Sequence, residues 1–245
     1  SVTSSRGGNT LNVNGQTLTV NASPVWNTPF FSGAGQIVKD GAGSYVLNYD
    51  NATVPFNGMY VVSNGTLTFA NYGGSFNTAT NVIVASSGAG TGTCVICANN
   101  ALPLQFTING PGFSGAGALQ YGGGQNPYLM NRPVTVASDA GWSIPAGQTI
   151  EYSGTLGGSG TLTVFGGGTL KIMNGAATHD GTIVVTNGTL SVPARLGTVT
   201  NITVRSGGTL NGAQAHFPGA GVVLDGGTWN SNDTASTWSG LGDGS

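Results

Sequence analysis

Two cysteines three residues apart are the residues whose spacing most directly suggests chemistry. Cys94 and Cys97 form a CxxC pair, the spacing of thiol–disulfide redox motifs and of half a zinc site. A redox CxxC normally opens a helix, whereas this pair lies in a Gly/Thr-rich stretch typical of a strand, and the chain has no second cysteine pair to complete a zinc site. In an extended strand the two sulfurs point to opposite faces, so a local bond requires a turn. A structural disulfide across a tight bend and two small buried thiols are both compatible with the sequence.

Histidines and carboxylates are the next candidates for catalysis. His179 precedes Asp180, and His216 lies well downstream, so a Ser-His-Asp arrangement would depend on geometry that this spacing does not supply. The carboxylates are dispersed, and none aligns with a lysine or arginine at a regular spacing: Asp40, Asp50, Asp139, Glu151, Asp180, Asp225, Asp233 and Asp243. The sequence therefore predicts no catalytic residues, no metal site and no cofactor.

Aromatic side chains and threonine pairs suggest two kinds of binding. Exposed aromatic rings stack on sugars, and the candidates are Trp26, Trp142, Trp229, Trp238, Tyr45, Tyr49, Tyr60, Tyr72 and Tyr121. Thr-x-Thr pairs on a flat β surface can bind ice, but pairs such as Thr17-Leu18-Thr19 do not fall on successive repeats. A regular threonine lattice is therefore not expected.

A glycine that returns at a fixed interval shows which elements must position these residues. Spacings of 20, 20 and 19 residues separate Gly168-Thr169-Leu170, Gly188-Thr189-Leu190, Gly208-Thr209-Leu210 and Gly227-Thr228-Trp229. Each tripeptide is entered through a turn pair, Gly-Gly or Asn-Gly, that supplies positive φ at little cost. Short strands and glycine turns with a period of about 20 residues are typical of a β-solenoid.

Alignment of the repeats on their glycines predicts the core. One column, which is expected to point inward, consists of Leu170, Leu190, Leu210 and Trp229. The threonine that precedes each of these residues is expected to point outward. Upstream, Val184, Val204 and Val223 are predicted to form a second inward column. With about 20–24 residues in each coil, the sequence predicts an all-β fold, a single-stranded parallel β-helix of roughly ten to twelve coils.

Similarity at longer range predicts one continuous β-solenoid over residues 1–245, made of two tandem related units. Residues 60–68 resemble residues 183–191, and residues 81–84 resemble residues 201–204. The units span about 8–107 and 133–235, and a Gly-rich loop segment, 108–132, joins them.

Composition excludes several classes of protein. Only 6% of residues are charged and the net charge is −2, but 38% are hydrophobic and lie in short alternating runs, which indicates a folded chain. The six lysines and arginines are scattered, so no nucleic-acid partner is expected. No run approaches 18 consecutive apolar residues, so no membrane insertion is expected. The polar start without a signal peptide and the Gly-rich end lead us to expect a segment of a longer surface protein.

Three stretches, 15–20, 32–43 and 185–192, resemble the autotransporter-associated β-strand repeat of bacterial surface proteins. In that family a Gly-Ala-Gly strand is followed by a short loop and a Gly-Thr-Leu strand. The resemblance covers nearly the whole chain, most clearly residues 8–70 and 145–212. It implies a parallel β-helix passenger that is extracellular or at the bacterial cell surface. Such repeats serve as stalks under many functional heads, so the resemblance implies fold and location more than activity.

These patterns together predict a non-enzymatic extracellular structural module: a rigid stalk, an adhesin shaft or a self-assembling filament subunit. Uncapped strand edges at the solenoid ends predict head-to-tail self-association or continuation into further repeat modules. The alternative is an adhesin module that binds surface glycans or a host surface through loops near residues 71–80 or 110–131. A carbohydrate-active β-helix enzyme is the third hypothesis.

Overall fold

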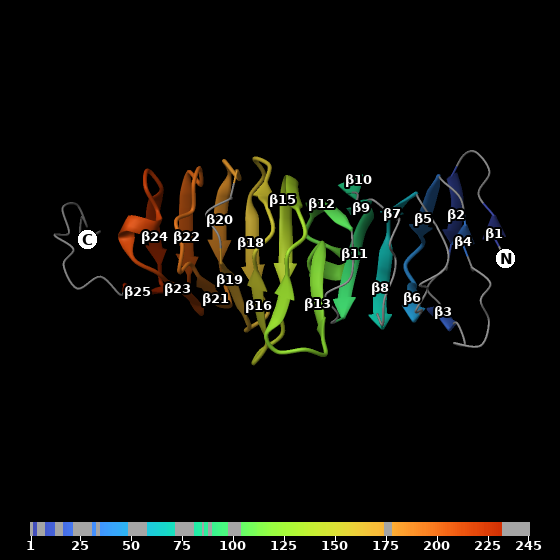
Figure 1. The fold of residues 1–245 in the computed structure, drawn as a ribbon, viewed down its shortest axis with the longest axis horizontal. Helices are drawn as coiled ribbons and strands as arrows, with labels where there is room; N and C mark the ends of the chain where they lie inside the picture. Colours follow the sequence, from blue (N-terminus) through green and yellow to red (C-terminus); the bar gives the residue numbers. More distant parts are fainter. Residues whose placement is uncertain are drawn as a thin grey trace.

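Short runs of β-branched and aromatic residues, separated by glycines, form the strands of this protein. The computed structural model describes residues 2–3, 8–12, 17–21, 31–32, 35–48, 58–71, 81–84, 86–87, 90–97, 104–173 and 178–231. Parallel strands stack along one axis, from β2 and β5 at one end to β24 and β25 at the other (Figure 1). The predicted all-β parallel β-solenoid is confirmed.

Three ladders of parallel strands build the solenoid. The first consists of β2 (Gly8–Asn12), β5 (Gln36–Asp40), β7 (Met59–Val62), β9 (Asn81–Val84), β12 (Gln105–Gly110), the first part of β15 (Val134–Ser143) and β17 (Leu156–Gly157). Counted along this ladder, the solenoid has about seven turns, and the second ladder continues for three further strands, so the count differs slightly from the predicted ten to twelve. Several turns are longer than predicted, because Asn9 pairs with Ile37 and Phe106 with Val134, each 28 residues further along.

The second and third ladders close the remaining sides. The second consists of β3 (Thr17–Asn21), β6 (Ser44–Asn48), β8 (Gly65–Asn71), β11 (Gly90–Cys97), β13 (Leu119–Gly123), the last part of β15, β18 (Leu162–Phe165), β20 (Thr182–Val185), β22 (Asn201–Arg205) and β24 (Gly221–Asp225). The third consists of β14 (Tyr128–Met130), β16 (Thr149–Tyr152), β19 (Thr169–Ile172), β21 (Gly188–Ser191), β23 (Gly208–Asn211) and β25 (Thr228–Asn230).

A few short elements complete the described part of the chain. Strand β1 (Val2–Thr3) pairs with β4 (Phe31–Ser32), β10 (Ser86–Ser87) runs antiparallel to β11, and two 3-10 turns are η1 (Phe113–Gly115) and η2 (Gln214–His216). Segment 108–132, expected to be a joining loop, contributes β13 and β14 to the stack. The described residues hold no helix with the length and apolar character that crossing a membrane requires.

The third ladder aligns the repeated tripeptides in register. Leu170, Leu190 and Leu210 are consecutive partners and are fully buried, and Trp229 follows them, partly buried against the core. The threonine before each of them is a partner of the next threonine and is partly or fully exposed. Alternation of inward and outward side chains along each short strand therefore builds the shared core.

The predicted second inward column is wrong by one residue. Val204 pairs with Val185 and Leu224, whereas Val184 pairs with Thr203. The inward column is therefore Val185, Val204 and Leu224, and Val223 faces outward with 51% of its surface exposed. Adjacent valines hid the alternation, and a shift of one residue in a strand exchanges its two faces.

Glycine pairs at the corners meet two different needs. Gly207 has a φ of +78°, which favours glycine. Gly208 lacks a positive φ, but a Cβ atom there would lie 2.4 Å from the carbonyl oxygen of Val185. The first glycine makes the bend and the second allows the neighbouring coil to approach.

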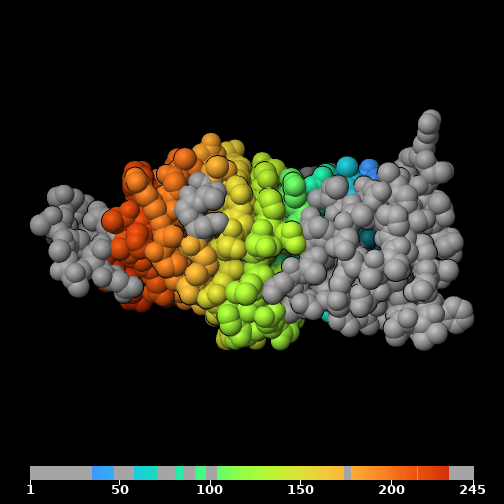
Figure 2. All heavy atoms as spheres, viewed as in Figure 1, coloured from blue at the N-terminus to red at the C-terminus, as the bar shows by residue number. Residues whose placement is uncertain are grey.

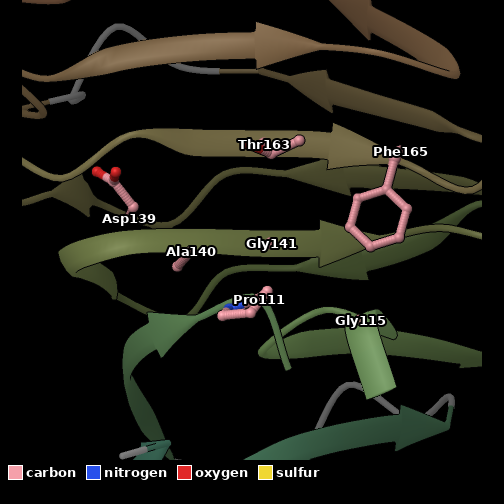
Figure 3. A pocket seen from close by; sticks show the side chains of 7 residues that line it. All are labelled: Pro111, Gly115, Asp139, Ala140, Gly141, Thr163 and Phe165. Atoms are coloured by element: carbon pink, nitrogen blue, oxygen red, sulfur yellow. The ribbon is translucent and has the colours of Figure 1, made fainter. Parts of the chain in front are cut away.

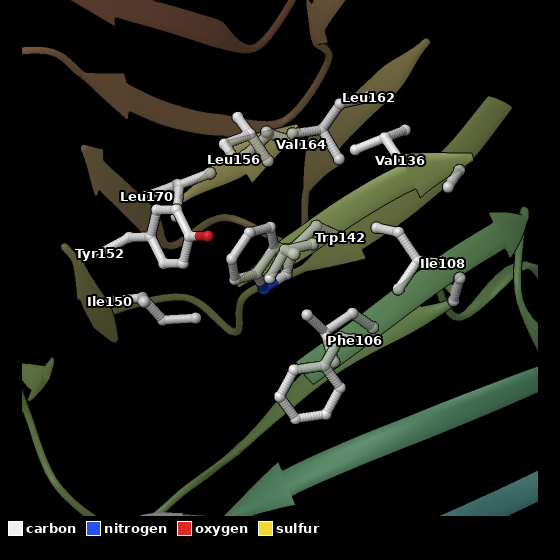
Figure 4. Close-up of a cluster of buried hydrophobic side chains, with 14 of the residues drawn as sticks. Phe106, Ile108, Val136, Trp142, Ile150, Tyr152, Leu156, Leu162, Val164 and Leu170 are labelled. Atoms are coloured by element: carbon white, nitrogen blue, oxygen red, sulfur yellow. The ribbon is translucent and has the colours of Figure 1, made fainter. Parts of the chain in front are cut away.

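One hydrophobic core runs through the stack from Ile37 to Phe217. Trp142 lies fully buried near the centre of this core, and its ring centroid is 5.5 Å from that of Tyr152 in an edge-to-face arrangement. Phe106 belongs to the same cluster of buried side chains (Figure 4). Seen from outside, successive turns form closely packed bands of side chains across the described surface (Figure 2). Each turn covers the core of the one before it, so the core is continuous along the axis.

Candidate functional site

The two cysteines lie in one extended strand as unpaired thiols. Both belong to β11, where Cys94 is fully buried and Cys97 is partly buried. Burial raises the pKa of the Cys94 thiol and that of the Cys97 thiol, so both favour the protonated form, which is a poor nucleophile and metal ligand. Of the two arrangements that the sequence left open, the structure contains the thiol pair.

The histidines lie apart and do not form a catalytic arrangement with Asp180. His179 is fully buried, whereas the adjacent Asp180 is exposed. Neither ring nitrogen of His179 has a hydrogen-bond partner among the described residues. His216 lies in η2, where its Nδ1 atom is 2.7 Å from the carbonyl oxygen of Val192. His216 thus contacts the preceding turn of the solenoid, and no hydrogen bond joins the two described histidines.

Described carboxylates make local contacts between turns. Glu151 forms an ion pair with Lys171 at 2.9 Å, and these two are register partners on β16 and β19. Asp139 accepts a hydrogen bond from the backbone N–H of Thr161 at 2.9 Å. No three histidine, cysteine or acidic side chains in the described ranges come close enough to hold a metal ion. Asp50, Asp233 and Asp243 lie outside those ranges.

Lys39, one of the six scattered lysines and arginines of the sequence, points into the solenoid. Its side chain is 1% exposed, and its Nζ donates to the carbonyl oxygens of Asp40 at 3.0 Å, Gly41 at 2.7 Å and Asn64 at 2.9 Å. Burial lowers the pKa of Lys39, and the adjacent Asp40 charge partly offsets that effect. This ammonium group joins two successive corners, a structural role.

The aromatic candidates for sugar stacking that the structure describes lie in the core or pack against it. Trp142, Tyr45, Tyr60 and Tyr121 are buried, and Trp229 donates its Nε1–H to the carbonyl oxygen of Gly212 at 2.9 Å. The remaining aromatic candidates, Trp26, Tyr49, Tyr72 and Trp238, lie outside the described residues, as do residues 72–80 of the predicted binding loop at 71–80.

A shallow groove on the outer face of the second ladder is a candidate binding site in the described part of the chain. It has a volume of about 220 Å³ and is lined by Pro111, Gly115, Asp139, Ala140, Gly141, Thr163 and Phe165. Strand β15 supplies Asp139, Ala140 and Gly141, and the neighbouring strand β18 supplies Thr163 and Phe165 (Figure 3). Pro111 and Gly115 come from the predicted binding segment 110–131.

Gly141 and Phe165 give the groove its shape. A Cβ atom at Gly141 would lie 3.0 Å from Cε1 of Phe165 and 3.1 Å from Cα of Gly117, so the absence of a side chain there leaves room for the aromatic ring. The Asp139 carboxylate and the Thr163 hydroxyl add polar groups to this mostly apolar surface. An aromatic face with nearby acceptors can hold a small polyhydroxy ligand. Sequence analysis did not identify Gly141 or Phe165. Alternation along β18 was the only sign in the sequence that Phe165 faces outward.

The outer surface of the third ladder carries two different columns. Thr149, Thr169, Thr189, Thr209 and Thr228 form an unbroken column of register partners. The neighbouring outward column holds Leu129, Glu151, Lys171, Ser191, Asn211 and Asn230. A charged pair therefore interrupts any two-column threonine lattice on this face.

The last described turn leaves core positions uncovered. Leu224 belongs to the inward column, yet it is 44% exposed, whereas Val204 and Val185 beneath it are fully buried. Strand β24 pairs with β22, and β25 pairs with β23, and no described strand pairs with the other edge of either. Leu224 therefore presents apolar surface at this end of the described stack.

Comparison of the chain with protein-family models, with curated proteins and with solved structures finds no match.

Proposed function

We propose that this chain is a non-enzymatic structural module whose solenoid forms a stiff shaft in an extracellular bacterial surface protein. The shaft serves as a stalk, as the shaft of an adhesin or as a self-assembling filament subunit. The observation that carries the proposal is the single core that runs unbroken from Ile37 to Phe217 beneath three parallel ladders. Bending such a rod would break backbone pairing and core packing together, so stiffness follows from the stacking.

Two further features support the extracellular location and the assembly. The resemblance of residues 15–20, 32–43 and 185–192 to the autotransporter-associated repeat implies a surface passenger. Leu224, which is 44% exposed, and strand β24, whose only partner among the described strands is β22, fit continuation of the stack into another module or another copy. Only 6% of the residues in the whole chain are charged, so charge repulsion between two such modules is weak.

Small-angle X-ray scattering and sedimentation velocity of the purified chain test this function. We expect a rod-shaped particle whose length grows with concentration while its cross-section stays constant. A compact, globular particle at low concentration would contradict the shaft, and growth in the cross-section would contradict stacking along the axis.

The groove beside Phe165 favours a second function, the binding of neutral surface glycans. Asp139 is the only charged residue lining it, which disfavours anionic sugars and leaves neutral sugars as the better fit. Binding of neutral oligosaccharides to the wild-type chain and to Phe165→Ala, measured by calorimetry, tests this. Loss of binding in Phe165→Ala, with binding retained in Met173→Ala, an exposed apolar residue outside the groove, is the expected result. Equal binding by all three proteins would exclude the groove as the site.

A further inference from the structure

An asparagine that precedes a glycine is chemically labile, and this chain contains seven such pairs. The backbone nitrogen of the glycine can attack Cγ of the asparagine, because glycine has no Cβ atom to obstruct the approach. In a folded chain the two atoms must be held together, so the hydrogen bonds of each pair decide whether it reacts. Four of the pairs lie wholly within the described residues: Asn64-Gly65, Asn109-Gly110, Asn187-Gly188 and Asn211-Gly212.

At the corner between β7 and β8, the side chain of Asn64 faces the backbone nitrogen of Gly65. The N–H of Gly65 donates to Oδ1 of Asn64 at 2.8 Å. Because Cγ is bonded to Oδ1, the Gly65 nitrogen lies at most about 4 Å from Cγ, close to the separation of about 3–3.5 Å that favours reaction. Asn64 is partly exposed, so water and hydroxide from the solvent reach its amide.

A buried ammonium group contacts the peptide bond that must lose a proton. Nζ of Lys39 donates to the carbonyl oxygen of Asn64 at 2.9 Å, and this carbonyl belongs to the same peptide bond as the nitrogen of Gly65. Loss of the N–H proton leaves a negative charge that this nitrogen shares with the carbonyl oxygen. A fixed ammonium group at hydrogen-bond distance stabilises that charge, and Lys39 is only 1% exposed, so solvent screens it little.

The other three described pairs have their reacting groups engaged with neighbouring turns. The N–H groups of Gly188 and Gly212 donate to carbonyl oxygens of the next turn, at 3.3 Å and 3.2 Å. The side chain of Asn109 donates through Nδ2 to a carbonyl oxygen at 2.9 Å and accepts a hydrogen bond from a serine hydroxyl at 3.1 Å. Each of these contacts would have to break before the glycine nitrogen could reach Cγ.

We propose that Asn64 is a site of spontaneous deamidation in the folded protein, with Lys39 as its positioning residue. Hydroxide from the solvent removes the N–H proton of Gly65, and the nitrogen forms a bond to Cγ of Asn64. The bond from Cγ to Nδ2 then breaks, and Nδ2 takes a proton from water and leaves as ammonia. This step regenerates the hydroxide and closes a succinimide ring.

Water opens the succinimide at either of its two carbonyl groups, which leaves aspartate or isoaspartate at position 64. The net change is the uptake of one water molecule and the loss of one ammonia molecule. Aspartate would place a carboxylate beside the buried ammonium group of Lys39. Isoaspartate would add a methylene group to the main chain at the corner between β7 and β8. The site is thus a chemical change built into one corner of the solenoid, beyond the proposed shaft function.

Peptide mass spectrometry of the folded chain, incubated in mildly alkaline buffer, tests the site. Deamidation raises the mass of a peptide by about 1 Da. We expect Asn64 to react at least about tenfold faster than Asn109, Asn187 and Asn211 in the folded chain, and all four to react at similar rates in urea. Equal rates in the folded chain, or slower reaction at Asn64, would overturn the proposal. A preference for Asn64 that persists in urea would assign it to local sequence and would also overturn the proposal.

Lys39→Met tests the positioning role. In the folded chain this substitution should slow the deamidation of Asn64 about tenfold. Burial lowers the pKa of Lys39, so the difference between wild type and variant should shrink as rising pH removes the charge from the wild-type side chain.

Lys171→Met is the matched control, because it removes a partly exposed ammonium group from its ion pair with Glu151 and should leave the rate at Asn64 unchanged. Circular dichroism checks that both variants keep the strand content of the wild type. An unchanged or faster reaction in folded Lys39→Met, or a difference that does not vary with pH, would overturn the role of Lys39. The comparison of the four pairs needs no variant and decides the site by itself.

Discussion

Leu190→Ala should destabilise the solenoid far more than a substitution one residue away on the same strand. Leu190 lies in the middle of the third-ladder column, with Leu170 on one side and Leu210 on the other, and all three are fully buried. Thr189 precedes it on β21 and faces outward. The pair therefore compares the core and the surface of a single coil.

The expected magnitude follows from the burial of Leu190. Loss of its outer carbons removes about 2.4 kcal/mol of transfer free energy, at about 0.8 kcal/mol for each buried CH₂ group. The residual cavity adds to this, because ladders fixed on both sides restrict collapse, so the free energy of unfolding should fall by about 3–4 kcal/mol. Thr189→Ala should cost about 1 kcal/mol or less. Leu224→Ala, at the uncovered end, should cost about half as much as Leu190→Ala, because nearly half of Leu224 is already exposed.

Urea unfolding, followed by far-UV circular dichroism and by fluorescence of the buried Trp142, gives these differences. Equal m-values for the wild type and the variants would show that the same surface is exposed on unfolding. Equal costs for Leu190→Ala and Thr189→Ala would refute the inward assignment of the leucine column. A cost for Leu224→Ala as large as that for Leu190→Ala, at concentrations where the chain is monomeric, would refute the open end.

Three further predictions follow from buried groups. Burial raises the pKa of Tyr128 to about 12, above the value of about 10 in the unfolded chain. The contribution of the neutral Tyr128 hydroxyl to the free energy of unfolding is therefore complete below pH 10 and is lost as pH rises through 12. Unfolding titrations should show this loss, amounting to about 2–3 kcal/mol, and Tyr128→Phe should remove that part of the pH dependence. Iodoacetamide at pH 8 should leave Cys94 unmodified in the native chain and modify it in urea, and mass spectrometry that finds it blocked in both would indicate a disulfide. Gly208→Ala should cost about 1–3 kcal/mol, because its Cβ atom would lie 2.4 Å from the carbonyl oxygen of Val185, whereas Gly157→Ala, with only Thr178 Oγ1 at 3.2 Å, should cost less in thermal unfolding.

Local spacing made the fold class predictable. Glycines at a fixed interval before Thr-Leu fix both the corner and the phase of the strand that follows, and the register of Leu170, Leu190 and Leu210 has that same spacing. The upstream strands lack such a signal. Adjacent valines at 184 and 185 fit either phase, and only pairing with Val204 determines which of them faces the core.

Features created by neighbouring turns were beyond sequence reasoning. The groove joins Gly141 to Phe165, and Lys39 finds one of its three acceptors at Asn64, contacts that depend on the register between coils. The similarity of residues 60–68 to residues 183–191 likewise does not fix position around the axis, because β7 belongs to the first ladder and β20 to the second. The tandem units about 8–107 and 133–235 therefore remain a prediction.

Electron microscopy of the purified chain over a range of concentrations tests the central claim, that turns stack into a shaft whose open end receives another copy. The account predicts unbranched fibres one solenoid wide, with an axial repeat equal to the length of one chain. Isolated rods of a single chain's length at every concentration would contradict it.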